Sequence, residues 1–133
     1  MAAEWALFTK STFASGVEST IAKDSSPLGV TSSFQFWDPY PISVVSAKGA
    51  WMTDVDGRQL LDLSMGFGAM LAGHLNEEVI AETKAALEGG TLFVTPSPIS
   101  RDGAERLFKR FGIEKVRFAN SGTEATMYAV RTA

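Results

Sequence analysis

The chain has 133 residues, of which 45% are hydrophobic, and its formal net charge at pH 7 is −3. This length and apolar fraction suffice for one ordinary domain with a core, whereas the interspersed charges provide no basic surface for nucleic acid. Cysteine is absent and His74 is the only histidine, which excludes disulfides, thiolate nucleophiles, and metal sites built from cysteines or from several histidines.

The sequence also lacks the signals of a membrane or secreted protein. No stretch approaches the roughly 18 uninterrupted apolar residues of a membrane span. The N-terminus carries Glu4 early and has no basic region followed by a long apolar core, so a signal peptide is not expected. We therefore expect a soluble, cytoplasmic protein with no membrane partner.

The N-terminal part is predicted to form a helix and then a long loop. Apolar residues recur at near-helical spacing over residues 4–23, although Gly16 interrupts them. Residues 25–41, SSPLGVTSSFQFWDPYP, favour neither helix nor strand because they hold three prolines and several Ser and Thr. Loops of this kind often line binding sites. Their aromatic side chains would also suit simple attachment to a core, and both interpretations stay open.

A small antiparallel meander is predicted next, with turns at Lys48-Gly49 and at residues 54–57. Asp54 and Asp56 fit the role of turn residues better than that of an acid/base pair. The expected strands are residues 42–45, 50–54 and 59–63.

The remainder of the chain is predicted to be mainly helical. Asn76 is a suitable N-cap for a helix that Gly89-Gly90 ends, and Gly112 closes the next helix. The order helix, helix, strand, helix is that of the opening of an α/β domain. The expected elements are helices at residues 77–88 and 101–111, a strand at 115–119 and a helix at 123–133, with apolar helix faces turned inward.

The turn Asn120-Ser121-Gly122-Thr123, between a predicted strand and a helix, is the best candidate for chemistry. A helix start presents unpaired N–H groups and partial positive charge. Gly122 allows close approach, and the Ser121 and Thr123 hydroxyls add donors for a phosphate. A P-loop is excluded because Glu124 stands where a lysine is required. On local chemistry alone, a plain N-cap and a phosphate site both remain possible.

Several motifs fall in one order along the chain. They are residues 116–125 (VRFANSGTEA), residues 49–58 (GAWMTDVDGR), Leu61-Asp62, Gly66, Gly68, Met70, Gly73-His74 and Glu78-Val79. Together they resemble class III aminotransferases, the pyridoxal 5'-phosphate (PLP) enzymes of fold type I. Gly29-Val30-Thr31-Ser32 is similar to a loop of the glutamate-1-semialdehyde 2,1-aminomutase group within that family. The resemblance covers about residues 27–133.

The resemblance implies roles for particular residues. Ser121, Gly122 and Thr123 would hold the phosphate of PLP through backbone N–H groups and hydroxyls. Phe67 would line the substrate side, where the aminomutases typically have tryptophan. Gln35, beside Trp37, stands where the aminomutase loop carries an arginine that binds the substrate carboxylate. Because glutamine makes no charged bidentate clamp, an aromatic or otherwise less polar amino donor is expected.

The resemblance also implies a fold and an activity. Residues 1–75 would form the N-terminal helix, substrate loop and β-meander, and residues 76–133 the start of the PLP-binding large domain of an α/β fold. The enzyme would be a homodimeric aminotransferase that uses an amino donor and a keto-acid or aldehyde acceptor. The alternatives are a PLP-dependent isomerase (an aminomutase or epimerase), a non-catalytic remnant that binds a partner, and a generic phosphometabolite-binding domain.

No lysine of the chain is a candidate for the Schiff base with PLP. In the family, that lysine and the aspartate paired with the pyridine nitrogen both follow the phosphate turn, beyond Ala133. The chain is therefore expected to be the N-terminal part of a longer enzyme, and to be inactive alone. The lysines excluded are Lys10, Lys23, Lys48, Lys84, Lys109 and Lys115.

Overall fold

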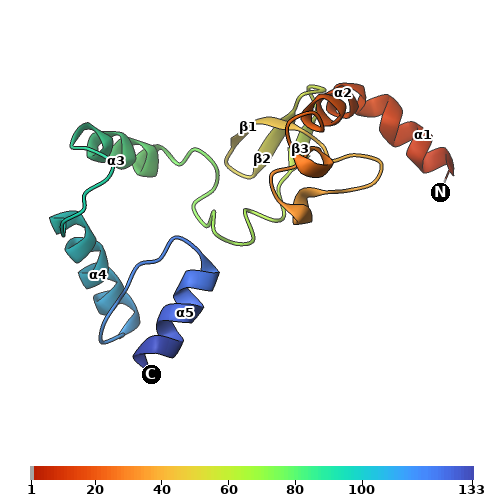
Figure 1. Ribbon diagram of the computed structural model, residues 1–133. Helices are drawn as coiled ribbons and strands as arrows, with labels where there is room; N and C mark the ends of the chain where they lie inside the picture. Colours follow the sequence, from red (N-terminus) through yellow and green to blue (C-terminus); the bar gives the residue numbers. More distant parts are fainter. Residues whose placement is uncertain (1) are drawn as a thin grey trace. The chain divides into compact units, whose positions relative to one another are not determined.

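The chain consists of short helices and one small sheet (Figure 1). The computed structural model describes residues 2–133. They form two compact units, which divide after Ala85, within the third long helix. Each unit is described by itself, and the domain boundary predicted at residues 75 and 76 stays a prediction.

The first unit begins with two helices, α1 (Ala2–Ser11) and α2 (Phe13–Ala22). The N-terminal helix predicted over residues 4–23 is present but divided in two, because the backbone leaves the helical conformation at Thr12 (φ −129°, ψ 37°). The Thr12 side chain is fully buried, and its hydroxyl donates to the Phe8 carbonyl over 2.7 Å. Its oxygen also lies 3.1 Å from the Tyr40 hydroxyl, a contact that a local sequence pattern does not reveal.

The predicted loop and meander follow in the expected order. Residues 25–41 are irregular apart from two short 3-10 turns, η1 (Pro27–Gly29) and η2 (Ser33–Gln35). The sheet is antiparallel in the order β1-β2-β3, which confirms the meander. Its strands are β1 (Val44–Lys48), β2 (Trp51–Asp54) and β3 (Gln59–Leu61).

Helices dominate the rest of the chain. The helix α3 (Glu77–Glu88) has its predicted N-cap, since Asn76 Oδ1 accepts from the Val79 N–H over 3.1 Å. The helix α4 (Pro98–Phe111) begins three residues earlier than predicted and ends at Gly112, as expected. The last helix is α5 (Gly122–Thr132). These ends confirm that capping residues mark helix boundaries well.

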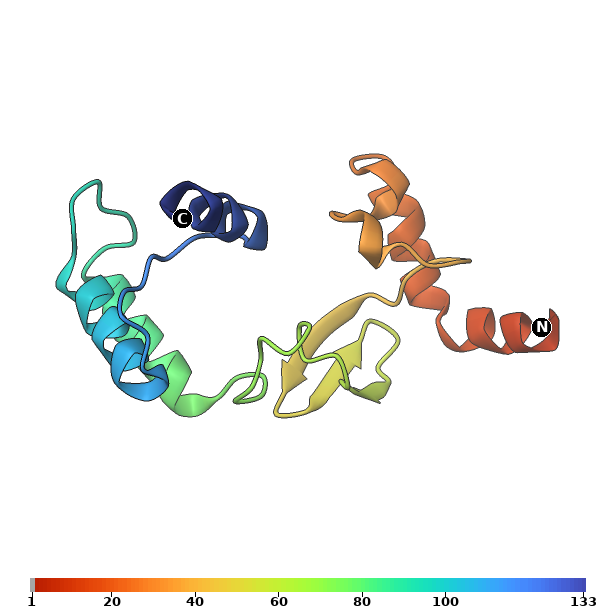
Figure 2. The same ribbon diagram turned by 90° about the horizontal axis from the view of Figure 1, so that it is seen from below.

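The strand predicted at residues 115–119 is wrong. This segment runs back beside α4 (Figure 2), and a Cβ at Gly103 would lie 3.5 Å from the Phe118 ring. It joins no β-ladder within residues 2–133. A strand exists only where a second strand meets its backbone groups, and sequence alone does not reveal such a partner.

The buried residues are polar. Among residues 3–133, whose side-chain burial is described, no hydrophobic residue is buried, and the predicted inward helix faces are therefore wrong in this chain. Leu87 of α3 is 53% exposed and Phe108 of α4 is 51% exposed. The buried side chains are Thr12, Ser15, Ser19, Asp54 and Asp62.

Candidate functional site

The turn before α5 is organised by a reciprocal cap. The Ser121 hydroxyl oxygen accepts from the Glu124 N–H over 3.2 Å. The Glu124 Oε2 atom in turn accepts from the Asn120 N–H (2.9 Å) and from the Ser121 hydroxyl (3.2 Å). This arrangement resembles a capping box, except that Glu124 accepts from the N–H of Asn120, one residue before the N-cap Ser121. The Ser121 hydroxyl is therefore engaged within the turn itself.

Three donors at this helix start point to an anion site. Within residues 2–133, neither the N–H groups of Gly122 and Thr123 nor the Thr123 hydroxyl makes a hydrogen bond. A Cβ at Gly122 would meet nothing within 4 Å, so the backbone is open to a ligand. Two N–H groups, a hydroxyl and the positive end of the helix dipole suit a phosphate group. The donor set thus fits the cofactor phosphate, with Ser121 shaping the turn.

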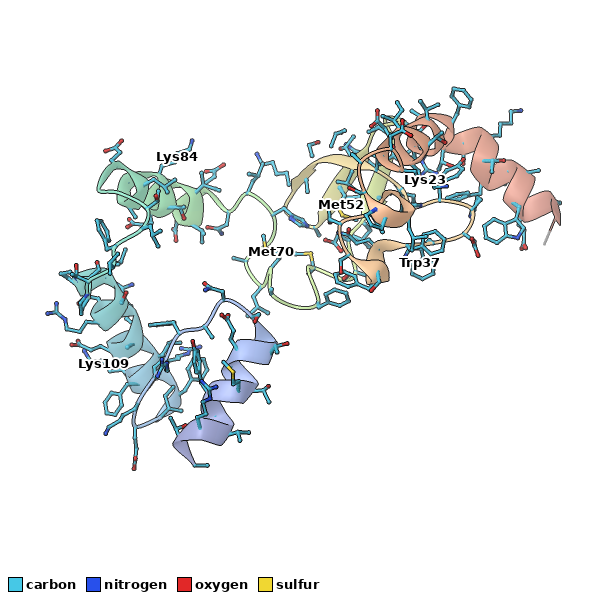
Figure 3. All side chains as sticks on the ribbon, viewed as in Figure 1. Lys23, Trp37, Met52, Met70, Lys84 and Lys109 are labelled. Atoms are coloured by element: carbon cyan, nitrogen blue, oxygen red, sulfur yellow. The ribbon has the colours of Figure 1, made fainter. Side chains whose placement is uncertain are left out.

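A separate cavity lies in the first unit. Its volume is about 790 Å³, within the range of small-molecule sites, and Gln35, Trp37 and Phe67 all line it. Figure 3 shows two of its residues, Trp37 on the loop and Met52 on β2. The structure therefore brings together the three residues that the sequence placed on the substrate side. Their role in substrate binding stays a proposal.

Phe67 and Gln35 are held by specific contacts. Phe67 has φ +56°, a left-handed conformation that is strained for a bulky residue and often marks a functional position. Its ring meets Phe34 edge to face, with centroids 5.4 Å apart. The Thr31 hydroxyl donates to Gln35 Oε1 over 2.8 Å, which leaves the neutral Gln35 Nε2 group as the available donor.

Asp62 holds both ends of the loop that carries Phe67. It is 7% exposed, and its Oδ1 atom accepts from the N–H groups of Ser64 (2.9 Å) and Met65 (2.8 Å). Its Oδ2 atom lies 2.7 Å from His74 Nε2. The hydrogen bond with His74, followed by that from Met65, lowers the pKa of Asp62. The sequence alone gave no sign of this partner for His74.

The other two carboxylates of the meander are also engaged. Asp54 is 1% exposed and accepts from the Arg58 N–H (2.8 Å) and from Arg58 Nε (2.7 Å). Asp56 accepts from the start of α2, a contact that sequence reasoning missed. Asp54 therefore stabilises the turn, which is the role expected of it, whereas the Asp56 side chain bonds to α2.

The lysines of the chain lie on its exterior. All six are exposed, including Lys23, Lys84 and Lys109 (Figure 3). Within the part of the chain that the structure describes, no group of His, Asp or Glu side chains is arranged to hold a metal ion. In the same part, no helix is both long and apolar enough to cross a bilayer.

Solved structures similar to the chain define its class as that of the fold type I PLP transaminases. The β-phenylalanine aminotransferase of Variovorax paradoxus is 28% identical and superposes with a TM-score of 0.93, over 98% of this chain and 30% of its own. A transaminase solved with PLP bound is 36% identical, with a TM-score of 0.86, over 90% of this chain and 28% of its own. The predicted α/β fold class is thereby confirmed.

The chain belongs to the class III aminotransferase family, whose model matches residues 35–133. Among curated relatives, a glutamate-1-semialdehyde 2,1-aminomutase of Nitrosopumilus maritimus is 42% identical over 113 residues, 84% of this chain. The chain spans 27% of that relative's length. The resemblance deduced from the motifs is confirmed.

Proposed function

We propose that the protein carrying this chain is a PLP-dependent aminotransferase whose amino donor has an aromatic or apolar side chain. The observation that carries this proposal is the composition of the cavity around Gln35, Trp37 and Phe67. Among residues 2–133, no lysine, arginine or histidine lines it, and its one carboxylate is that of Asp38. An acidic substrate side chain would find no cation there, whereas aromatic rings offer favourable packing and edge-to-face contacts.

The cofactor would be held by the start of α5. PLP, when bound, supplies an electron sink that stabilises negative charge on the carbon bearing the amino group. The N–H groups of Gly122 and Thr123 and the Thr123 hydroxyl would bind its phosphate, while the Ser121–Glu124 cap fixes their direction. The similarity to a transaminase solved with PLP bound supports this role.

Binding of the cofactor tests this part of the proposal without any turnover. Thr123→Val removes one hydroxyl donor at nearly constant volume and is expected to weaken PLP binding by the full-length protein roughly tenfold. Thr126→Val is the matched control, because the Thr126 hydroxyl already donates to the Gly122 carbonyl over 2.9 Å. Equal affinities of the two variants, measured by equilibrium dialysis, would refute the assigned role of Thr123.

A PLP-dependent isomerase is the second candidate. It is favoured by the 42% identity to a glutamate-1-semialdehyde 2,1-aminomutase. Against it, Gln35 offers only a neutral amide to a substrate carboxylate, and Thr31 already binds its Oε1 atom. Either enzyme is proposed to act as a homodimer, which sedimentation equilibrium of the full-length protein tests.

Substrate assays separate the two candidates. We expect amino transfer from an aromatic amine or amino acid to a keto acid, and little conversion of glutamate-1-semialdehyde. Gln35→Arg is expected to raise kcat/KM for acidic substrates relative to aromatic ones by roughly tenfold. Efficient isomerisation of glutamate-1-semialdehyde without amino transfer, or unchanged selectivity of Gln35→Arg, would count against the proposal.

A further inference from the structure

The aromatic cavity has a wall that lies outside the segment matched by the family model. Trp5 and Phe8 of α1 line it together with Trp37 and Phe67, whereas the model matches only residues 35–133. Trp5 and Phe8 meet edge to face, with ring centroids 6.4 Å apart. Two aromatic side chains from the N-terminal helix therefore contribute to the surface that a ligand would contact.

Tyr40 joins this wall to the loop that carries Gln35 and Trp37. Its ring lies 5.6 Å from that of Phe8, centroid to centroid. The Tyr40 hydroxyl oxygen lies 3.1 Å from the Thr12 hydroxyl oxygen and 3.4 Å from the Thr9 carbonyl oxygen, and it can donate its proton to either. The Tyr40 ring also covers Gly16, where a Cβ would come within 2.9 Å of it. The bend between α1 and α2 thus packs, through Tyr40, against the loop of residues 25–41.

Asp56, in the turn between β2 and β3, fixes the start of α2. Thr12, the N-cap residue of α2, makes no side-chain cap. Asp56 takes that place by accepting from the N–H groups of Ala14 (2.7 Å) and Ser15 (3.0 Å) and from the Ser15 hydroxyl (2.7 Å). Burial raises the pKa of Asp56, but the Ser15 and Ala14 hydrogen bonds outweigh it and the net pKa is lowered. A carboxylate is the form that a helix start favours.

We propose that α1 is a specificity element: Trp5 and Phe8 form one side of the pocket for the substrate's aromatic side chain, and Asp56 is the positioning residue that holds them there. The inference rests on the proposed function, since it names the side chains that would contact the aromatic group of the amino donor. It differs from the family's phosphate turn and arginine loop because its residues lie in the first 22 positions and in the β2–β3 turn.

Fluorine NMR of the full-length protein labelled with fluorotryptophan tests the wall without any variant in the pocket. The probe is phenylpropionate, which carries a ring and a carboxylate but no amino group to react with the cofactor. The Trp5 and Trp37 resonances, assigned by single Trp→Phe replacements, are expected to shift along one titration curve. Trp51, which is 53% exposed and does not line the cavity, is the internal control and should stay unchanged. Propionate, without a ring, should shift none of them.

Two variants examine the wall and its support. Trp5→Ala is expected to weaken phenylpropionate binding roughly fivefold, by loss of an aromatic contact. In Asp56→Asn, helix α2 loses its charged cap, so α1, which precedes it, should be held less firmly. The change in the Trp5 resonance on adding phenylpropionate should then fall by roughly half or more, while the change in the Trp37 resonance persists. Glu18→Gln makes the same charge change on α2 at an exposed side chain that forms no hydrogen bond or ion pair within residues 2–133, and it should behave like the unmodified protein.

The possible outcomes separate this inference from the proposed function. If Trp37 shifts and Trp5 does not, the pocket binds aromatic ligands without α1 and the inference is wrong, while the aminotransferase proposal stands. If neither resonance shifts, the cavity is not an aromatic pocket and the inference is also wrong. If both resonances shift but no amino transfer is found, the role of α1 in the pocket is supported and the proposed aminotransferase reaction is refuted.

Discussion

Asp62 makes three hydrogen bonds around the loop that carries Phe67. It ties the start of the loop through Ser64 and Met65 and its end through His74, with the Phe67 ring between them. One carboxylate therefore bonds to both ends of the loop that carries Phe67, and the Gly49 backbone also holds the second end through His74. The contact with His74 spans 12 residues of sequence, so no local spacing predicts it.

The first prediction concerns the pKa of Asp62 in the full-length protein. It should lie below the ordinary value of 3.8, and His74→Leu should raise it towards that value, because the largest lowering contribution is the His74 hydrogen bond. A lowered pKa means that ionised Asp62 stabilises the folded protein above the unfolded-state value, and that this contribution is lost as pH falls through the folded-state value. NMR titration of the side-chain carboxyl carbon measures the Asp62 pKa in the unmodified protein and in His74→Leu. An unchanged pKa in the variant would contradict the role given to the His74 hydrogen bond.

Gly73 shows a second constraint at the residue scale. Its φ is +81°, and a Cβ there would lie 3.2 Å from the Gly49 backbone, which forms a two-way bridge with His74. Gly57 has nearly the same φ, +80°, with nothing within 4 Å. The two positions therefore share the left-handed conformation and differ in crowding.

The second prediction uses this pair. Gly57→Ala should destabilise the full-length protein by about 1 kcal/mol, the cost of a left-handed alanine. Gly73→Ala should cost a further amount of about 1–3 kcal/mol, because the new methyl group presses on backbone that cannot rotate away. Denaturant unfolding measures the two free energies. Equal losses would show that the Gly49 backbone gives way without cost.

At the scale of elements, helix ends were predictable and nonlocal contacts were not. Asn76 and Gly112 mark the start of α3 and the end of α4 because capping is a local interaction. Thr12, at the break, contacts Tyr40, 28 residues along the chain, and residues 115–119 meet no second strand within residues 2–133. For the site, the motif resemblance supplied Gln35, Trp37 and Phe67, but not the support from Asp56 or the wall from α1, since periodicity does not show which surfaces meet.

The third prediction tests whether a cap at an N-cap position acts through its hydrogen bond. Ser121 caps α5 through the Glu124 N–H, whereas Ser97, at the N-cap of α4, makes no side-chain cap bond. Ser121→Ala should therefore destabilise the start of its helix by about 1 kcal/mol, and Ser97→Ala by much less. Hydrogen exchange of the first-turn amides in the full-length protein should accelerate roughly fivefold in Ser121→Ala only. Similar acceleration in both variants would mean that the Ser121 bond contributes nothing.

At the scale of the whole molecule, the distribution of burial is the dominant fact. The buried side chains of the described chain are polar, and those of Thr12, Ser15, Asp54 and Asp62 are hydrogen-bonded, while large apolar residues on every helix and on the sheet are exposed. Hydrogen bonds contribute modestly to net stability, and apolar burial is the main term that opposes chain entropy. The contacts of Asp54, Asp56 and Asp62 therefore specify local geometry without supplying the energy of a folded domain.

The fourth prediction follows for residues 1–133 produced as an isolated polypeptide. With no buried apolar core, the polypeptide should unfold gradually, without the cooperative heat absorption of about 0.7 kcal/mol per residue that globular domains show. It should also bind a hydrophobic dye and associate as its concentration rises, because apolar patches of this extent favour contact with one another. Calorimetry and light scattering over a range of concentrations measure both effects. A single sharp transition with a midpoint independent of concentration would mean that the two units build a core of their own, and that the exposed apolar side chains of the helices and sheet become covered within the 133 residues.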